Sequence, residues 1–452
     1  MEVIKQVKKV FKTTMLLTVI AVFMMTIIVP QQAKADESLN IMADAAILVD
    51  AETGKILYEQ NADAALGIAS MTKMMTEYLM FEAIADGRIT WDQEYSVTEY
   101  THQVSQDTRL SNVPLRADGT YTIKELYEAM AIYSANAATI GIAETIAGTE
   151  GEFVRLMNEK AQELGLTDTK FVNSTGLNNA DLKGMHPEGT RETDENVMPA
   201  RSVAKLAKVL MEDYPEVLET TSIAKAVFRD GTDDKTNMPN WNFMLPGLVY
   251  EYEGMDGLKT GTTDFAGHAF TGTAKRGDTR LISVVMKAVD SEGVGSYKAR
   301  FDATRALLDF GFGQFSKEEI LPAGYQFKGN EKLSVTKGKE KEVNIAVKEP
   351  ITMMVRSSEK DAYKPELVLD ESLLTDGELE AAIKKDQVVG TVKLTNEDGS
   401  DYGYLDGGAN AAEVVTTESV ERANWFSLSL QAIGSFFSTM WGGAVDFIKG
   451  LF

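Results

Sequence analysis

Cysteine is absent from the 452-residue chain, and histidine occurs only three times. The lack of cysteine excludes disulfides, thiol nucleophiles and Cys-ligated metal sites. None of the histidines, His102, His186 and His268, lies in a recognisable hydrolase motif, and His186 falls in a polar loop where we expect it to be solvated. We therefore expect any nucleophile in this chain to use a base other than histidine.

Positive charge is also scarce, because 45 Lys and Arg residues face 68 Asp and Glu residues, giving a formal net charge of −23. Residues 1–35 carry five Lys and one Glu, a net of +4, so their removal takes the charge from −23 to −27. A chain this acidic is a poor candidate for binding nucleic acid or anionic lipid by electrostatics. Any attachment to a membrane must therefore be hydrophobic.

The N-terminal segment has the pattern of a secretory signal peptide. Lysines at positions 5, 8, 9 and 12 precede an uncharged run, residues 15–29, and Pro30 and Ala33-Lys34-Ala35 follow. A basic start, an apolar centre and an A-x-A site predict cleavage after Ala35. The alternative is an uncleaved anchor, since the uncharged stretch 13–33 is just long enough to span a membrane. The helix-breaking Pro30 favours cleavage, so we expect an exported mature chain that begins at Asp36.

The rest of the chain divides by composition into a first domain at 36–315, a small domain at 316–415 and a tail at 416–452. Strands are predicted at 45–50 and 56–58, near the start of the first domain, and at 267–274 and 280–288, near its end. Helical patterns lie between these strands. This order predicts an α+β domain with an antiparallel sheet.

The stretch from Ser70-Met71-Thr72-Lys73 to Gly87 predicts a helix, with Gly87 as its C-cap. Its residues are apolar on nearly all sides, which is typical of a buried helix. Residues three apart share one face of a helix, so Ser70 and Lys73 would lie together at its N-terminus. The motif alone is weak, because Ser-x-x-Lys occurs four more times, at Ser202–Lys205, Ser222–Lys225, Ser334–Lys337 and Ser357–Lys360.

Two further short motifs follow. Ser134-Ala135-Asn136 separates a helix predicted over 121–133 from a second one over 137–146, so its side chains should lie inside the domain. The alternative is an ordinary helix N-cap, where Ser and Asn are common. Lys259-Thr260-Gly261 occurs once and precedes the last predicted strands. Its alternative interpretation is a hairpin strand with an exposed lysine.

In chain order, the three motifs read Ser-x-x-Lys, Ser-x-Asn and Lys-Thr-Gly, the signature of active-site serine penicillin-binding proteins and β-lactamases. None of the other Ser-x-x-Lys copies is followed by both later motifs. The stretch 68–76 and the layout of 36–452 resemble the low-molecular-mass penicillin-binding proteins that are D-alanyl-D-alanine carboxypeptidases of the S11 peptidase type. The fold that this resemblance implies is a β-lactamase-like catalytic domain followed by an all-β domain.

The resemblance implies hydrolysis of the terminal D-Ala from a peptidoglycan stem pentapeptide ending in D-Ala-D-Ala, which limits cross-linking of the cell wall. An acyl-Ser70 intermediate would form, and penicillin would acylate the same serine. Lys73 can act as the base if a second cation lowers its pKa, and Lys259 is the candidate that the resemblance supplies. Ser134 would relay the proton to the leaving amine, and Asn136 would hold the substrate's amide.

The same resemblance assigns Lys259 and Thr260 to the carboxylate end of the peptide or drug. Backbone N–H groups of Ser70 and Thr262 would form the oxyanion hole, usually the largest single contribution in acyl transfer. Arg300, in a helix predicted at 296–312, is a further candidate for the carboxylate. No metal and no cofactor is implied.

A β-lactamase is a competing interpretation. Enzymes of class A use a Glu and an Asn four apart, a spacing that Glu192 and Asn196 have. They stand too close to a helix predicted at 200–211 and lack that family's preceding leucine, so we interpret them as a solvated acidic turn. Ala135, where the β-lactamases have Asp, also argues against that class. A cross-linking transpeptidase stays open on the motifs alone, whereas the intact motifs argue against a cell-surface binding protein with an inactive hydrolase domain.

The C-terminal third has two patterns of its own. Short alternating runs such as 343–347 predict a small all-β domain, which we interpret as a spacer or pedestal. From Asn424 onward, apolar residues recur at three- and four-residue steps with Trp and Phe among them, which predicts an amphipathic helix. We expect this helix to hold the protein peripherally on the outer face of the cytoplasmic membrane. The alternative is a helix docked on the protein itself.

Overall fold

The computed structural model describes residues 39–356, 358–396, 401–407 and 410–424. The predicted signal peptide and the amphipathic helix beyond Asn424 lie outside these residues. Within them, no helix is both long enough and apolar enough to cross a membrane.

A five-stranded antiparallel sheet forms the centre of the first domain, with strand order β2-β1-β11-β10-β9. The first two strands of the chain therefore pair with the last three of the domain, which confirms the predicted α+β class. The strands are β1 (Ala43–Asp50), β2 (Ile56–Gln60), β9 (Met255–Thr263), β10 (Gly267–Arg276) and β11 (Thr279–Ala288).

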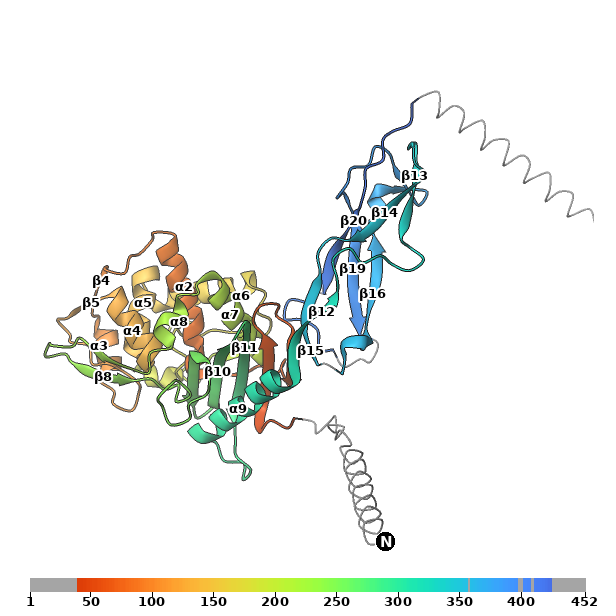
Figure 1. The fold of residues 1–452 in the computed structure, drawn as a ribbon. Helices are drawn as coiled ribbons and strands as arrows, with labels where there is room; N and C mark the ends of the chain where they lie inside the picture. Colours follow the sequence, from red (N-terminus) through yellow and green to blue (C-terminus); the bar gives the residue numbers. More distant parts are fainter. Residues whose placement is uncertain (1–38, 357, 397–400, 408–409, 425–452) are drawn as a thin grey trace, which may run out of the picture. The chain divides into compact units, whose positions relative to one another are not determined.

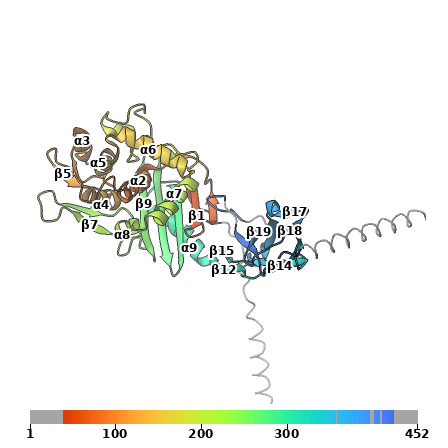
Figure 2. The ribbon, with the colours of Figure 1, turned by 90° about the horizontal axis from the view of Figure 1, so that it is seen from above.

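Helices cover both faces of this sheet (Figures 1 and 2). On one face lies α9 (Tyr297–Gln314), which Gly311 allows to approach closely, since a Cβ there would lie 2.6 Å from Cδ1 of Leu281 and 2.8 Å from Cδ2 of Leu48. On the other face, Ile47 and Ile282 join the core that the other helices of the first domain share. Because side chains alternate between the faces of a strand, burial on both faces explains why residues 45–49 of β1 are all apolar.

Helix α2 is buried on nearly all sides, as its sequence predicted, because α4, α5, α6 and α7 pack against it: ten of its 13 residues are buried. The helices are α2 (Lys73–Ala85), α3 (Glu99–Ser105), α4 (Ile123–Tyr133), α5 (Asn136–Ala147), α6 (Glu150–Glu163), α7 (Ala200–Asp213) and α8 (Val217–Thr221). Short strand pairs connect them: β3 (Leu66–Gly67) with β6 (Val197–Met198), β4 (Glu94–Ser96) with β5 (Thr120–Thr122), and β7 (Lys225–Phe228) with β8 (Thr236–Pro239).

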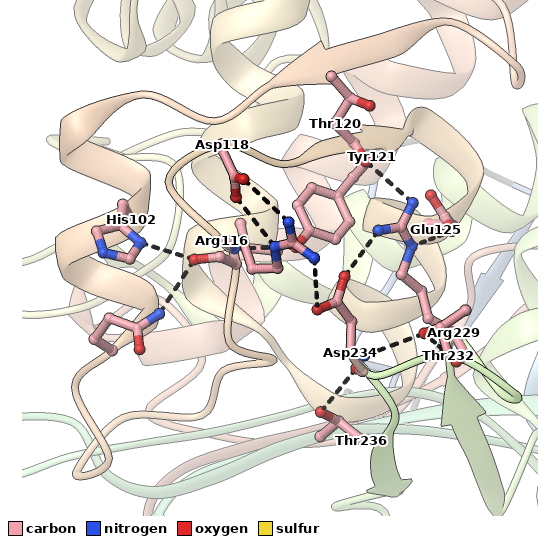
Figure 3. Close-up of polar contacts among 12 residues, drawn as sticks. His102, Arg116, Asp118, Thr120, Tyr121, Glu125, Arg229, Thr232, Asp234 and Thr236 are labelled. Carbon is pink, nitrogen blue, oxygen red and sulfur yellow. Dashed lines mark hydrogen bonds and ion pairs between the residues drawn. The ribbon is translucent and has the colours of Figure 1, made fainter.

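Arg229 ties the β7–β8 hairpin to the start of α4 (Figure 3). Its Nε donates to Glu125 at 2.9 Å, its Nη1 donates to Asp234 at 3.1 Å, and its guanidinium lies 4.4 Å from the ring centroid of Tyr121. The residues after β8 carry Trp241, whose Nε1 donates to the carbonyl of Tyr133 at 3.1 Å. The turn of the hairpin is thus held by Arg229 near the start of α4, and the chain after the hairpin is held by Trp241 at the end of α4.

The second domain is all-β, as predicted. Seven strands form a sheet in the order β16-β19-β20-β14-β13-β18-β17, and β12 pairs with β15. The strands are β12 (Phe315–Leu321), β13 (Lys332–Thr336), β14 (Glu342–Val347), β15 (Ile351–Arg356), β16 (Tyr363–Leu369), β17 (Leu374–Thr375), β18 (Glu378–Glu380), β19 (Val388–Asn396) and β20 (Ala411–Thr416). Residues 416–424, which the sequence placed with the helical tail, belong to this domain instead. Val420 is buried in its core and bridges to Ile383, so the chain continues to pack against this domain after β20 ends.

Candidate active site

Ser70 lies in a tight turn at the entrance to α2. Residues Ala69–Thr72 form a single 3₁₀ turn, η1, and α2 begins at Lys73 rather than at Ser70 as predicted. The three-residue spacing still brings the two side chains together, since Lys73 Nζ lies 3.0 Å from Ser70 Oγ. The hydroxyl therefore stands at the N-terminus of a buried helix with an amine within hydrogen-bond reach.

The amine of Lys73 has three polar neighbours. Besides Ser70, it contacts Asn136 Oδ1 at 2.8 Å and the carbonyl oxygen of Thr175 at 2.8 Å. Both of those oxygens can only accept, so each must receive an N–H from the lysine. A neutral amine has two N–H groups and one lone pair, and the lone pair then faces Ser70, the one neighbour of the three that can donate. The geometry thus suits proton transfer from the hydroxyl to Lys73.

The surroundings favour that neutral form. Lys73 is fully buried, and burial lowers the pKa of its amine well below the ordinary value for lysine. The positive charge of Lys259 lowers this pKa further, while the carboxyl group of Glu77 opposes the shift. The sequence interpretation named Lys259 as the cause. In the structure, burial is the larger cause and Lys259 the second.

Ser134 and Asn136 lie at the junction of α4 and α5. Ser134 ends α4 in the left-handed conformation, with φ of 60°, and Asn136 is the first residue of α5, so neither is a conventional N-cap. Asn136 Nδ2 donates to the carbonyl of Ser111 at 3.0 Å, which fixes its Oδ1 toward Lys73. The buried Oγ of Ser134 makes no hydrogen bond within the described chain. A buried hydroxyl without a partner beside the reactive pair is suited to a substrate or a transferred proton.

The loop that supplies Thr175 was not recognised in the sequence. Asn173 Oδ1 accepts hydrogen bonds from the backbone N–H groups of Thr175 and Gly176, at 3.0 and 2.7 Å. Gly176 has φ of +82°, and a Cβ there would lie 1.8 Å from the carbonyl oxygen of Ala69. Only glycine allows this loop to press against the Ser70 turn. An Asn three residues before a Gly is compatible with such a turn, but nothing in that pattern predicts that a carbonyl faces a lysine.

Asn196 holds the same loop, which corrects the interpretation of residues 192–196 as a solvated acidic turn. Its side chain is buried, with Nδ2 donating to Thr72 Oγ1 at 2.9 Å and Oδ1 accepting from Val172 N at 2.6 Å. Glu192, by contrast, is exposed. An amide can bridge two backbone segments with all its hydrogen bonds satisfied, and burial is then favourable. The Glu192–Asn196 spacing therefore reflects a structural asparagine beside a solvated glutamate.

Strand β9 brings the Lys-Thr-Gly motif against the Ser70 turn. A Cβ on Gly261 would lie 2.6 Å from the carbonyl of Ile68, so glycine is required for this contact. Lys259 is buried rather than exposed on a hairpin, and its Nζ donates to the carbonyl of Thr260 at 3.2 Å. Burial lowers the pKa of Lys259 to about 7, although Glu77 opposes the shift and Arg300 adds to it.

Arg300 is a buried part of the same group. Its Nη1 donates to the carbonyl oxygens of Gly261 and Ala269, at 3.0 and 3.2 Å, and to Thr262 Oγ1 at 3.0 Å. Burial lowers its pKa to about 10, which leaves the guanidinium charged at neutral pH. A fixed positive charge therefore stands behind the end of β9.

These groups open onto one cavity of about 390 Å³. Ser70, Ser134, Asn136, Thr260 and Thr262 line it, while Lys73 and Lys259 are buried beneath its wall. Its other lining residues are Thr108, Arg109, Leu110, Ser111, Tyr133, Leu177, Trp241, Tyr297 and Arg300. No cluster of three His, Asp or Glu side chains able to hold a metal ion occurs among the residues that the structure describes.

A serine that faces a buried lysine, with cationic side chains behind an antiparallel edge strand, defines a serine enzyme of the acyl-transfer class. Comparison with known proteins identifies the family. Residues 31–290 match the model of the D-alanyl-D-alanine carboxypeptidases, peptidase family S11, and residues 315–422 match the C-terminal domain of penicillin-binding protein 5. The chain belongs to the D-alanyl-D-alanine carboxypeptidase family, a family of serine peptidases.

Comparison with individual proteins supports this family assignment. The chain is 31% identical to D-alanyl-D-alanine carboxypeptidase DacF of Bacillus subtilis, over 86% of this chain and 91% of the relative. The crystal structure of a peptidoglycan synthesis regulatory factor (PBP3) from Streptococcus pneumoniae is 34% identical, with a TM-score of 0.69 over 84% of this chain and all of that one. Penicillin-binding protein D2 from Listeria monocytogenes, in a cefotaxime-bound form, is 33% identical, with a TM-score of 0.50 over 61% of this chain and all of that one.

Proposed function

We propose that this protein removes the terminal D-alanine from peptidoglycan stem peptides, with Ser70 as nucleophile and Lys73 as its base. The observation that carries the assignment is the position of Lys73 Nζ, 3.0 Å from Ser70 Oγ and held by two groups that only accept hydrogen bonds. The amine can therefore take the proton of Ser70 as the hydroxyl attacks the carbonyl of the D-Ala-D-Ala bond.

In this proposal, the other residues of the site take the following roles in the reaction. The Ser70 Oγ–C bond forms and the C–N bond breaks, and the proton held by Lys73 passes to the leaving amine through Ser134. Asn136 binds the amide of the substrate, while Thr260 and Arg300 face its terminal carboxylate, with the charge of Lys259 behind the wall at this end of the cavity. The backbone N–H groups of Ser70 and Thr262 stabilise the oxyanion, each worth roughly 3–4 kcal/mol in the transition state. Water hydrolyses the acyl ester and regenerates Ser70.

The β-lactam ring presents the same arrangement of a reactive carbonyl and a carboxylate, so the same serine accepts it. The relative from Listeria that is solved with cefotaxime supports this part of the proposal. An acyl group derived from penicillin then occupies Ser70 until water displaces it.

One pair of assays tests the assignment. D-Ala release from a diacyl-D-Ala-D-Ala peptide should be fast, and turnover of penicillin slow. The opposite ratio would support a β-lactamase, and transfer of the acyl group to an added amine in preference to water would support a transpeptidase. Ser70→Ala should take up no labelled penicillin, and label at the wild-type level would end the proposal.

We further propose export, with cleavage after Ala35, and peripheral attachment to the outer face of the cytoplasmic membrane through the helix beyond Asn424. The basic, apolar and A-x-A pattern of residues 1–35 supports the first part, and the amphipathic pattern of residues 425–452 supports the second. N-terminal sequencing of the mature protein should begin at Asp36. Because Val420 and Ala423 are buried in the β domain, the truncation that tests attachment should start at residue 425 and not at 420. The truncated enzyme should leave the membrane fraction with its activity intact.

A further inference from the structure

The proposed mechanism leaves one buried acid unexplained. Glu77 lies on α2, one turn after Lys73 and on the same face of the helix, with an exposed fraction of 0%. Neither carboxyl oxygen accepts a hydrogen bond in the chain that the structure describes. Burial of a carboxylate without partners is costly, so a group of this kind is retained where its charge has a purpose.

The charges that act on Glu77 are those of the active-site lysines. Burial raises the pKa of its carboxyl group to about 7, while Lys259 on β9 and Lys73 on its own helix oppose that shift. From α4, Tyr127 faces the same carboxyl group, which helps to keep the phenol protonated. From α6, Lys160 is paired with Glu82 further along α2, and α5 contributes the uncharged Asn136. The cations that act on the carboxyl group of Glu77 are thus the two active-site lysines, without direct hydrogen bonds to either.

We propose that Glu77 is a positioning residue for the reaction: it is the buried counter-charge that allows Lys73 to accept a proton while Lys259 stays cationic. The inference rests on the function proposed above and adds a third ionisable group to it. Glu77 does not touch the substrate. It acts through the two lysines.

A count of charges explains the need for it. In the reactive form, with Lys73 neutral, Lys259 protonated and Glu77 ionised, the three groups carry no net charge together. When Lys73 takes the proton of Ser70, the three carry +1. Without Glu77 the two lysines alone would carry +1 before attack and +2 after it. The oxyanion that forms carries the matching −1 in the cavity, but the two buried ammonium groups would still repel each other. Glu77 therefore stabilises the charge that develops on Lys73 in the transition state.

The pH dependence of acylation reports on this role. Acylation needs Lys73 without its proton, which sets the acid limb of the rate profile, and Lys259 with its proton, which sets the alkaline limb. The negative charge of Glu77 favours the protonated form of both lysines, so its removal lowers both pKa values. Both limbs must then move to lower pH together, by roughly 1 pH unit.

The test is the second-order rate of acylation by fluorescent penicillin, measured from pH 5 to 10 on the full mature chain. Glu77→Gln keeps the size of the side chain and removes the charge. Glu77→Leu removes the charge and also leaves no hydrogen-bonding group at this position. It serves as the second variant if Glu77→Gln does not fold. Glu77→Asp keeps the charge and should restore the wild-type position of both limbs. Glu82→Gln is the matched control, because it makes the same change on the same helix but away from Lys73 and Lys259.

We expect both limbs to shift to lower pH in Glu77→Gln and Glu77→Leu, and neither to shift in Glu82→Gln. A lower rate with unmoved limbs, or movement of one limb alone, would overturn the inference, because a merely structural role changes the amplitude of the profile and not its position. If the wild-type chain itself takes up no penicillin, the proposed function fails first and the inference fails with it. The labelled wild type therefore separates the two failures.

Discussion

Asn136 connects the nucleophile's base to the neighbouring loop: its Oδ1 accepts from Lys73 Nζ at 2.8 Å while its Nδ2 donates to the carbonyl of Ser111 at 3.0 Å. The second hydrogen bond orients the first. Because the amide cannot rotate without losing the Ser111 contact, Lys73 is offered an acceptor and never a donor at this position. The lone pair of the neutral amine is thereby directed toward Ser70.

Asn136→Ala should slow penicillin acylation by about 10- to 100-fold, the loss that corresponds to a hydrogen bond of roughly 1.5–3 kcal/mol. Lys73 would keep two neighbours but lose the acceptor that orients it. The measurement is the second-order rate of label uptake. The control is Asn158→Ala, which removes a similarly placed amide that binds the backbone of Phe171 outside the cavity. That variant should lose stability and keep its rate, so an equal loss of rate in both would contradict the prediction.

Lys73→Arg should lower the rate of acylation roughly 10²- to 10⁴-fold, which is the contribution of a general base. A guanidinium stays protonated in proteins and cannot receive the proton of Ser70. In the wild type, the rate should rise with pH as Lys73 loses its proton, and this rise should occur below the ordinary lysine pKa, since burial and Lys259 both favour the neutral form. The variant should show no such rise.

The matched control is Lys160→Arg, which changes another shielded lysine that is paired with Glu82 and Glu163. Its rate profile should follow the wild type. A Lys73→Arg enzyme with a normal acid limb would mean that a different group accepts the proton.

Gly176→Ala should destabilise the protein by more than about 2 kcal/mol and remove activity, because the new Cβ would collide with the carbonyl of Ala69 in a backbone conformation that already disfavours side chains. Unfolding in urea and penicillin labelling measure the two effects. Gly189→Ala is the comparison, since Gly189 has φ of +84° but a Cβ added there would have no atom within 4 Å. It should cost only about 1–2 kcal/mol of conformational strain. Similar losses in both variants would show that strain alone explains the effect.

Arg300→Lys should lower acylation by penicillin more than acylation by the methyl ester of penicillin, which lacks the carboxylate. The planar guanidinium holds two backbone carbonyls and Thr262 Oγ1 through Nη1, and a lysine cannot reproduce this while also facing a carboxylate. The ratio of the two rate constants is the measurement. Arg305→Lys, on the same helix, should leave the ratio unchanged because Arg305 binds the carbonyls of Tyr250 and Glu251. An unchanged ratio in Arg300→Lys would assign Arg300 to the support of β9 alone.

The sequence by itself determined the candidate residues that carry the proposed chemistry and the strands at the two ends of the first domain. Ser70 and Lys73 were readable because helical spacing places them on one face, and the strands were readable because β1 and β11 are rich in apolar residues, β-branched ones among them. The start of α2 was misjudged by one turn, since the capacity of residues 69–72 for a 3₁₀ turn depends on the β9 strand and the Gly176 loop that press against it.

Only the tertiary structure decided what surrounds the amine of Lys73. The carbonyl of Thr175 is a backbone group, so its position leaves no mark on the identity of residue 175. Asn196 resembled a solvated turn residue until its buried hydrogen bonds to Thr72 and Val172 were seen. Glu77 is one acid in an otherwise apolar helix, and its meaning depends on which lysines face it. Spacing along the chain predicts which residues are neighbours on one helix. The electrostatics of a buried site depend instead on groups that are 60 to 190 residues apart in sequence. These groups meet only when the sheet and the helices pack.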